Sequence, residues 1–233
     1  MPGLVIHILD VLTALLQASI VVVSLARGCT RRYLTINLYL AASTIVLFLR
    51  YYILSRHGLL SGEYFYFYYY SDALLTIGLY FTLMGLYATV FEEMKAAQYL
   101  RVFTILLLIG TAAFSCAVVQ QSGHRLLFTR YVVEMSQNLY FVGLILTYIL
   151  WGAVLKLRET RTRVIQLVLS LGVYFSAFAG NYALRNLYPQ LHFVWEFVPP
   201  ILGCLLPLSW AYAFWHIPED ARIAPSRLAV VPR

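Results

Sequence analysis

The sequence predicts an all-α integral membrane protein, a seven-transmembrane-helix bundle, and three observations lead to that prediction. Of its 233 residues 61% are hydrophobic and only 12% are charged, whereas a soluble domain carries about 25% charged residues. The mean hydropathy of +0.76 excludes a soluble globular protein, a disordered chain and a fibrous repeat. Finally, the chain contains seven apolar stretches, each close to the roughly 20 residues that cross a bilayer as a helix.

The seven stretches follow one another with short polar connections. The first carries Asp10 and lacks the basic start of a signal peptide, so we interpret it as a retained helix. The third and fifth exceed a minimal span, and tilt accommodates such lengths. The stretches are Leu4–Ala26, Leu34–Leu54, Tyr64–Phe91, Val102–Val119, Phe128–Leu155, Val164–Leu184 and Val194–Trp215.

The basic residues predict the orientation of the bundle. Twelve of the 17 fall on one side of the predicted spans and five on the other, and the positive-inside rule places the richer side in the cytoplasm. The amino terminus is then outside and the carboxyl terminus inside. The twelve are Arg27, Arg31, Arg32, Lys95, Arg101, Lys156, Arg158, Arg161, Arg163, Arg222, Arg227 and Arg233.

The spans leave little room for any further domain. We expect residues 1–215 to form one transmembrane domain and residues 216–233 to form a short extended cytoplasmic tail, because Pro218, Pro225 and Pro232 oppose a helix there. Signalling would therefore require a separate cytoplasmic effector or a membrane-complex partner. The basic loops Arg27–Arg32 and Lys156–Arg163 are the expected docking points.

Charged residues within the spans lie in the predicted outer halves. Such charges cost about 2.5–3.5 kcal/mol at a bilayer centre, so helices turn them toward the bundle interior. Helical spacing groups several of them with amides: Arg130, Glu134 and Asn138 are four residues apart in turn. The candidate ligand-binding residues are Asp10, Arg50, Asp72, Arg130, Glu134, Asn138, Asn181, Arg185 and Glu196.

Two interpretations of this outer cluster stay open. The charged side chains nearly balance, with four acids and three arginines, which is typical of pairing around an outward-facing polar cavity. A purely structural ion-pair network would look the same, because each charge except Arg130 also complements the dipole of its helix.

Two further patterns lie close to the outer cluster. Seven consecutive aromatic residues, 64–70, precede Asp72; they predict an aromatic belt, but they cover every face of a helix, so some rings must point inward. Pro199, Pro200 and Pro207 predict a kink or break in the last span.

Several functional classes are excluded or disfavoured. The only lysines, Lys95 and Lys156, fall on loops, so retinal bound to a lysine of the last helix is excluded. No soluble basic face exists for nucleic acid. No His/Cys spacing predicts zinc and no nucleophile–histidine pair predicts hydrolysis. We expect no cofactor, no metal and no enzymatic activity.

The sequence therefore favours a sensor or receptor-like protein with an outward-facing polar pocket for a small ligand. A small-solute or ion transporter that uses the acidic and arginine cluster is the first alternative. An accessory subunit of a larger membrane complex is the second. The absence of any Asn-x-Ser/Thr sequon favours a bacterial inner membrane.

Overall fold

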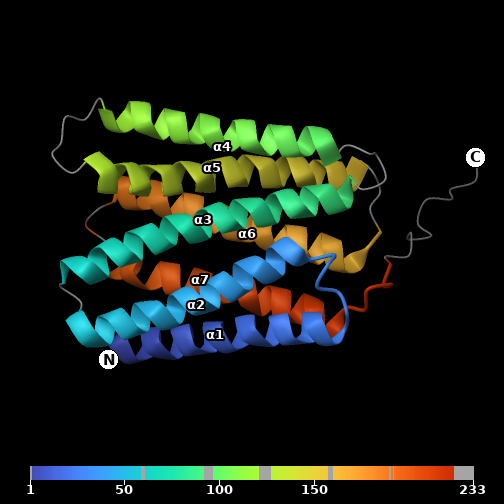
Figure 1. The fold of residues 1–233 in the computed structure, drawn as a ribbon, viewed down its shortest axis with the longest axis horizontal. Coiled ribbons are helices and arrows are strands. Elements are labelled where there is room, and N and C mark those ends of the chain that lie inside the picture. Colours follow the sequence, from blue (N-terminus) through green and yellow to red (C-terminus); the bar gives the residue numbers. More distant parts are fainter. Residues whose placement is uncertain are drawn as a thin grey trace, which may run out of the picture.

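The computed structural model describes residues 2–58, 61–91, 97–120, 127–156, 160–188, 190 and 192–222. Every predicted apolar stretch forms a helix. The axes of all seven helices lie roughly along the long axis of the bundle (Figure 1). Within these ranges no residue belongs to a named strand. The helices are α1 Pro2–Ala26, α2 Leu34–His57, α3 Gly62–Val90, α4 Ala97–Gln120, α5 Leu127–Lys156, α6 Thr162–Leu187 and α7 His192–His216.

Six helices are long and apolar enough to cross a membrane. They are α1, α2, α3, α5, α6 and α7, and this identification rests on length and composition. The apolar part of α4 that the structure describes in full, Ile105–Gln120, is shorter. These apolar helices identify the chain as a multi-pass membrane protein.

The helix ends follow from local sequence. Gly28 has φ +66° and Gly58 has φ +78°, a left-handed backbone that suits glycine and ends α1 and α2. The Ser61 side chain accepts a hydrogen bond from the Tyr64 N–H at 3.1 Å and caps the start of α3. These short turns keep consecutive helices antiparallel.

The helices form a closed ring of six with α4 outside it (Figure 1). Around the ring α1 contacts α2, α2 contacts α3, α3 contacts α5, α5 contacts α6, α6 contacts α7, and α7 returns to α1. The helix α4 packs on α5 and touches α3 only lightly. The core inside the ring is therefore built by six helices, with α3 and α6 also in contact across it.

Small residues let the helices approach closely. A methyl carbon added to Gly143 of α5 would lie 2.6 Å from Cζ and 2.7 Å from Cδ1 of Phe175 on α6, and the Phe175 side chain is fully buried. Gly85 of α3 is crowded in the same way by Thr35 near the start of α2. Such contacts supply the van der Waals packing that holds helices together in lipid.

Polar side chains join α1 to α2 inside the apolar surroundings. The Gln17 amide donates to Ser43 Oγ at 3.0 Å and accepts from Thr44 Oγ1 at 3.2 Å. Nearer the α1–α2 turn, Asn37 donates to Ser24 Oγ at 2.9 Å. The Gln17 amide and its two hydroxyl partners satisfy one another, as the low dielectric requires. No donor reaches the Oδ1 atom of Asn37 within the described residues.

The helix α7 continues through its prolines. Pro199, Pro200 and Pro207 all lie inside the helix His192–His216, so the predicted break does not occur. Each proline still lacks the N–H that would satisfy the carbonyl four residues earlier.

Candidate functional site

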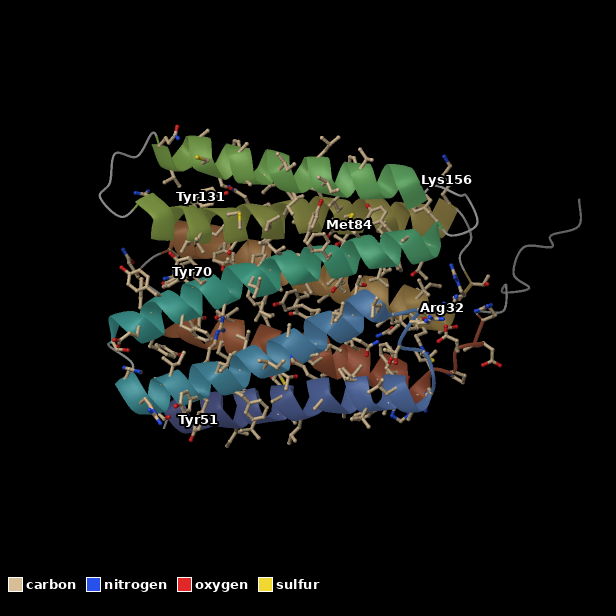
Figure 2. All side chains as sticks on the ribbon, in the orientation of Figure 1. Arg32, Tyr51, Tyr70, Met84, Tyr131 and Lys156 are labelled. Atoms are coloured by element: carbon tan, nitrogen blue, oxygen red, sulfur yellow. The ribbon has the colours of Figure 1, made fainter. Side chains whose placement is uncertain are left out.

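The two ends of the bundle carry different chemistry. We call the end that holds the starts of α1, α3, α5 and α7 the Asp72 end, and the opposite one the Arg163 end. Figure 2 shows Tyr51, Tyr70 and Tyr131 toward the Asp72 end and Arg32 and Lys156 at the Arg163 end.

The centre of the Asp72 end is an ion pair between α2 and α3. The Arg50 Nη2 atom lies 3.9 Å from Oδ1 of Asp72, which is longer than a hydrogen bond. Arg50 instead donates through Nε to Ser71 Oγ at 2.9 Å and through Nη2 to the Tyr68 carbonyl at 3.1 Å. Its guanidinium also lies 4.3 Å from the centre of the Tyr68 ring, a cation–π distance. The arginine is therefore held largely by neutral groups.

Tyrosines from several helices lie within electrostatic range of the Asp72 carboxylate. The carboxylate interacts electrostatically with the hydroxyl groups of Tyr39 on α2, Tyr140 on α5 and Tyr182 on α6. Tyr140 in turn stacks on Phe178 of α6 with ring centres 4.9 Å apart. One carboxylate thus lies at a meeting point of four ring helices.

Asp10 belongs to this neighbourhood and Arg185 lies at its edge. Asp10 and Arg50 both interact with the Tyr64 hydroxyl, which places α1, α2 and α3 together at the Asp72 end. Arg185 is exposed and interacts with Tyr182. The structure therefore brings together Asp10, Arg50 and Asp72 from the predicted cluster, with Arg185 close by.

The remaining predicted residues do not join this centre. Asn138 donates to Ser115 Oγ on α4 at 2.9 Å, so it points out of the ring toward the outer helix. Arg130 is exposed and Glu134 is half-buried. Asn181 is buried, and no donor reaches its Oδ1 atom within the part of the chain that the structure describes. The side chain of Glu196 lies outside the described part.

The predicted polar stripe on α5 is therefore divided. The sequence spacing correctly places Arg130, Glu134 and Asn138 on one helix face, but α5 has neighbours on two sides. Because α4 lies outside the ring, the end of this stripe finds a partner there.

A second polar centre at the Arg163 end was not identified from the sequence. Arg163 at the start of α6 is only 2% exposed. Its guanidinium donates to the Ile217 carbonyl at 3.0 Å and forms an ion pair with Glu219. It also lies 5.5 Å from the Phe214 ring centre. A buried arginine thus fixes the segment that follows α7, and we call this set of contacts the Arg163 clasp.

Residues of the turn between α1 and α2 complete the Arg163 clasp. Arg32 pairs with Glu219 at 2.9 Å and the Tyr33 hydroxyl donates to Glu219 at 3.2 Å. Burial, followed by the nearby Glu219 carboxylate, raises the pKa of Tyr33 to about 12. Arg27 donates to the Phe214 carbonyl at 2.7 Å and so caps the end of α7.

Several arginines of the basic loops contact the protein itself in the Arg163 clasp. Arg27, Arg32 and Arg163 were expected to face a cytoplasmic partner, yet each binds the end of α7 or the segment after it. Arg161 also donates to the Thr89 carbonyl of α3 at 2.9 Å. The one sequence signal for this was the acidic pair Glu219 and Asp220, which follows Pro218 directly.

The Asp72 end offers recognition chemistry. It holds the carboxylates of Asp10 and Asp72, the guanidinium of Arg50 and several phenol groups. Among the described residues no group of three His, Cys, Asp or Glu side chains is placed to hold a metal ion. No known protein family, curated protein or solved structure matches the chain.

Proposed function

We propose that this chain is a receptor-like protein of a bacterial inner membrane, with seven spans and its Asp72 end facing outward. A small ligand binds at Asp72 and Arg50, and a separate effector responds at the Arg163 end. The proposal places the amino terminus outside and the carboxyl terminus inside, as the bias of basic residues favours.

The single observation that carries the proposal is the loose Arg50–Asp72 pair. A structural ion pair inside an apolar bundle favours short, direct contacts, because only good geometry offsets the cost of removing both charges from water. Here the two charges stand 3.9 Å apart, and 31% of the Asp72 side chain remains exposed. That carboxylate is partly exposed, and its contact with Arg50 is not a direct hydrogen bond.

The opposite end supports a receptor over a transporter. Many core residues toward the Arg163 end are apolar and fully buried, among them Leu83, Leu150, Leu167 and Trp210, and the buried polar groups there, such as Asn37 and Arg163, are engaged in contacts within the protein. A transported polar solute would have to displace this packing. A receptor needs only a movement of helices relative to each other. The Arg163 clasp connects α2, α6 and α7 at the end of the bundle opposite Asp72, so a movement of these helices would change its contacts.

Native mass spectrometry of the gently purified protein tests the proposal. We expect a small molecule to remain bound to the wild type and to be absent from Asp72→Asn. Glu63→Gln is the matched control, because Glu63 is an acid on the same helix that is 70% exposed and pairs with His57. The control variant should retain the molecule.

Two outcomes would contradict this function. A bare monomer in both wild type and control would remove the evidence for a ligand. Retention of the same molecule by Asp72→Asn would move the site elsewhere. A second protein that stays bound to every variant would instead favour the accessory-subunit alternative.

A further inference from the structure

A groove runs between α4 and α5, and we call it the α4–α5 groove. Its volume is about 570 Å³, within the range of about 300–1,000 Å³ that small-molecule sites occupy. Along α4 it extends from Phe103 to Phe114, a length of about 16 Å at 1.5 Å per residue. From α5 it is lined by Phe141 and Ile145, and all four of these side chains are exposed. The groove is therefore elongated and open to the surrounding lipid.

The size of the α4–α5 groove favours a small molecule over a partner helix. A helix with its side chains is about 10–12 Å across and rises 5.4 Å per turn, so one turn fills roughly 400–600 Å³. A partner helix would therefore lie mostly outside a groove of about 570 Å³. An elongated lipid-like molecule matches both the volume and the length.

Two polar side chains line the α4–α5 groove, and they differ in how far they are satisfied. The Thr111 hydroxyl donates to the Leu107 carbonyl of its own helix at 2.8 Å. The Asn138 amide donates to Ser115 Oγ at 2.9 Å. Within the described residues this is the one hydrogen bond of the Asn138 side chain. Its Oδ1 atom and its second amide hydrogen are therefore still able to pair.

The depth of Asn138 makes this unused capacity significant. Asn138 lies about 12 Å along α5 from Arg130, well inside a hydrocarbon core of about 30 Å. Lipid chains at that depth offer no hydrogen bonds, and an amide that lacks partners there costs free energy. A ligand with a hydroxyl or carbonyl group would remove that cost. A charged ligand would not suit the groove, because its described lining residues carry no charge.

We propose that the α4–α5 groove binds an elongated neutral molecule from the lipid phase, which hydrogen-bonds to Asn138 through a hydroxyl or carbonyl group. Asn138 is the lining residue of α5 nearest the Asp72 end, so the apolar part of the ligand extends from there toward the Arg163 end. Gly110 leaves room for it, because a carbon added to this lining residue meets nothing within 4 Å. The groove is a site separate from Asp72, so the failure of either proposal leaves the other standing.

The test is photolabelling of the protein in phosphatidylglycerol nanodiscs. The probe is 9-heptadecanone with a diazirine near the end of one alkyl chain, and mass spectrometry maps the labelled residues. The competitors are unlabelled 9-heptadecanone and 9-methyleneheptadecane, in which a CH₂ group replaces the carbonyl oxygen. We expect labels on residues that line the groove. Because one net hydrogen bond corresponds to roughly 2- to 10-fold in affinity, the ketone should compete at a roughly 2- to 10-fold lower concentration than the hydrocarbon.

Variants then separate binding from packing. Asn138→Leu should abolish the advantage of the ketone while both competitors still bind. Ser115→Ala removes the contact between Asn138 and α4 but keeps the amide, so it should retain the advantage. Gly110→Leu should fill the groove and remove the labelling. Gly152→Leu is its matched control, because Gly152 is another uncrowded glycine that does not line this groove, and it should be labelled as the wild type is.

Four results would overturn the inference. The first is equal competition by ketone and hydrocarbon in the wild type. The second is a ketone advantage that survives in Asn138→Leu, and the third is groove labelling that survives in Gly110→Leu. The fourth is an unlabelled groove together with a dimer in native mass spectrometry, which would show that a second copy of the chain covers α4.

Discussion

Replacing Gly143 with alanine tests the close approach of α5 and α6. The added methyl carbon would lie 2.6 Å from Cζ of Phe175, whereas carbon atoms pack at about 3.5–4.0 Å. The ring or the helix must therefore move by about 1 Å. Because Phe175 is only 1% exposed, it has no solvent-side space to enter, and overpacking of this kind costs about 1–3 kcal/mol.

Gly152 provides a matched control on the same helix. A carbon added there meets nothing within 4 Å, so Gly152→Ala gains only the better helix propensity of alanine, about 0.5–1 kcal/mol. Gly143→Ala gains the same amount, and the difference between the two variants therefore isolates the steric cost. We expect Gly143→Ala to be less stable than Gly152→Ala by about 1–3 kcal/mol.

Reversible unfolding in mixed micelles, followed by circular dichroism, measures the free energy of unfolding of both variants. Phe175→Leu should relieve part of the crowding, so the double variant with Gly143→Ala should be more stable than the sum of the single effects predicts. Equal stability of Gly143→Ala and Gly152→Ala would refute the close α5–α6 contact.

Three further predictions concern buried polar groups. Arg163→Met should lower the free energy of unfolding by about 1.5–3 kcal/mol, because the Ile217 carbonyl and Glu219 lose hydrogen bonds to a charged donor. Lys156→Met, at an exposed site, should change it little, and equal losses would refute the role of the clasp. Since the pKa of Tyr33 is raised from 10.0 to about 12, its contribution is complete below pH 10 and is lost as the pH rises through 12. The stability advantage of wild type over Tyr33→Phe should therefore shrink in alkaline unfolding curves, and a constant difference would contradict this. Gln17→Leu should cost about 1–2 kcal/mol, because its hydroxyl partners on α2 lose a buried hydrogen bond; thermal unfolding that matches the wild type would show that these bonds contribute nothing.

The helices could be predicted from the sequence because hydropathy is a property of consecutive residues. The expected stretch Leu34–Leu54 lies within the helix Leu34–His57, and Val102–Val119 lies within Ala97–Gln120. The differences are confined to helix ends, where polar residues continue the helix beyond the apolar run. Arg56 and His57 at the end of α2 are examples.

The candidate site could be predicted only in part, because partners depend on which helices are neighbours. Asp72 and Arg50 meet because α2 and α3 are joined by a short turn and pack along their length. Asn138 finds Ser115 because α4 lies beside α5, and helical spacing says nothing about that placement. The Arg163 clasp joins residues more than 50 positions apart, and no local pattern reveals such a contact.

The place of α4 outside the ring has a geometrical consequence. The helices α3 and α5 lie side by side and run in the same direction (Figure 1), and parallel neighbours need a connection that returns the chain to its starting end. In this fold α4 is that return path, analogous to the crossover between parallel strands of a sheet. Its length and apolar character are then constrained more tightly than its side-chain identities. Replacing α4 by an unrelated apolar helix that keeps the Ser115 contact should leave the six-helix ring intact.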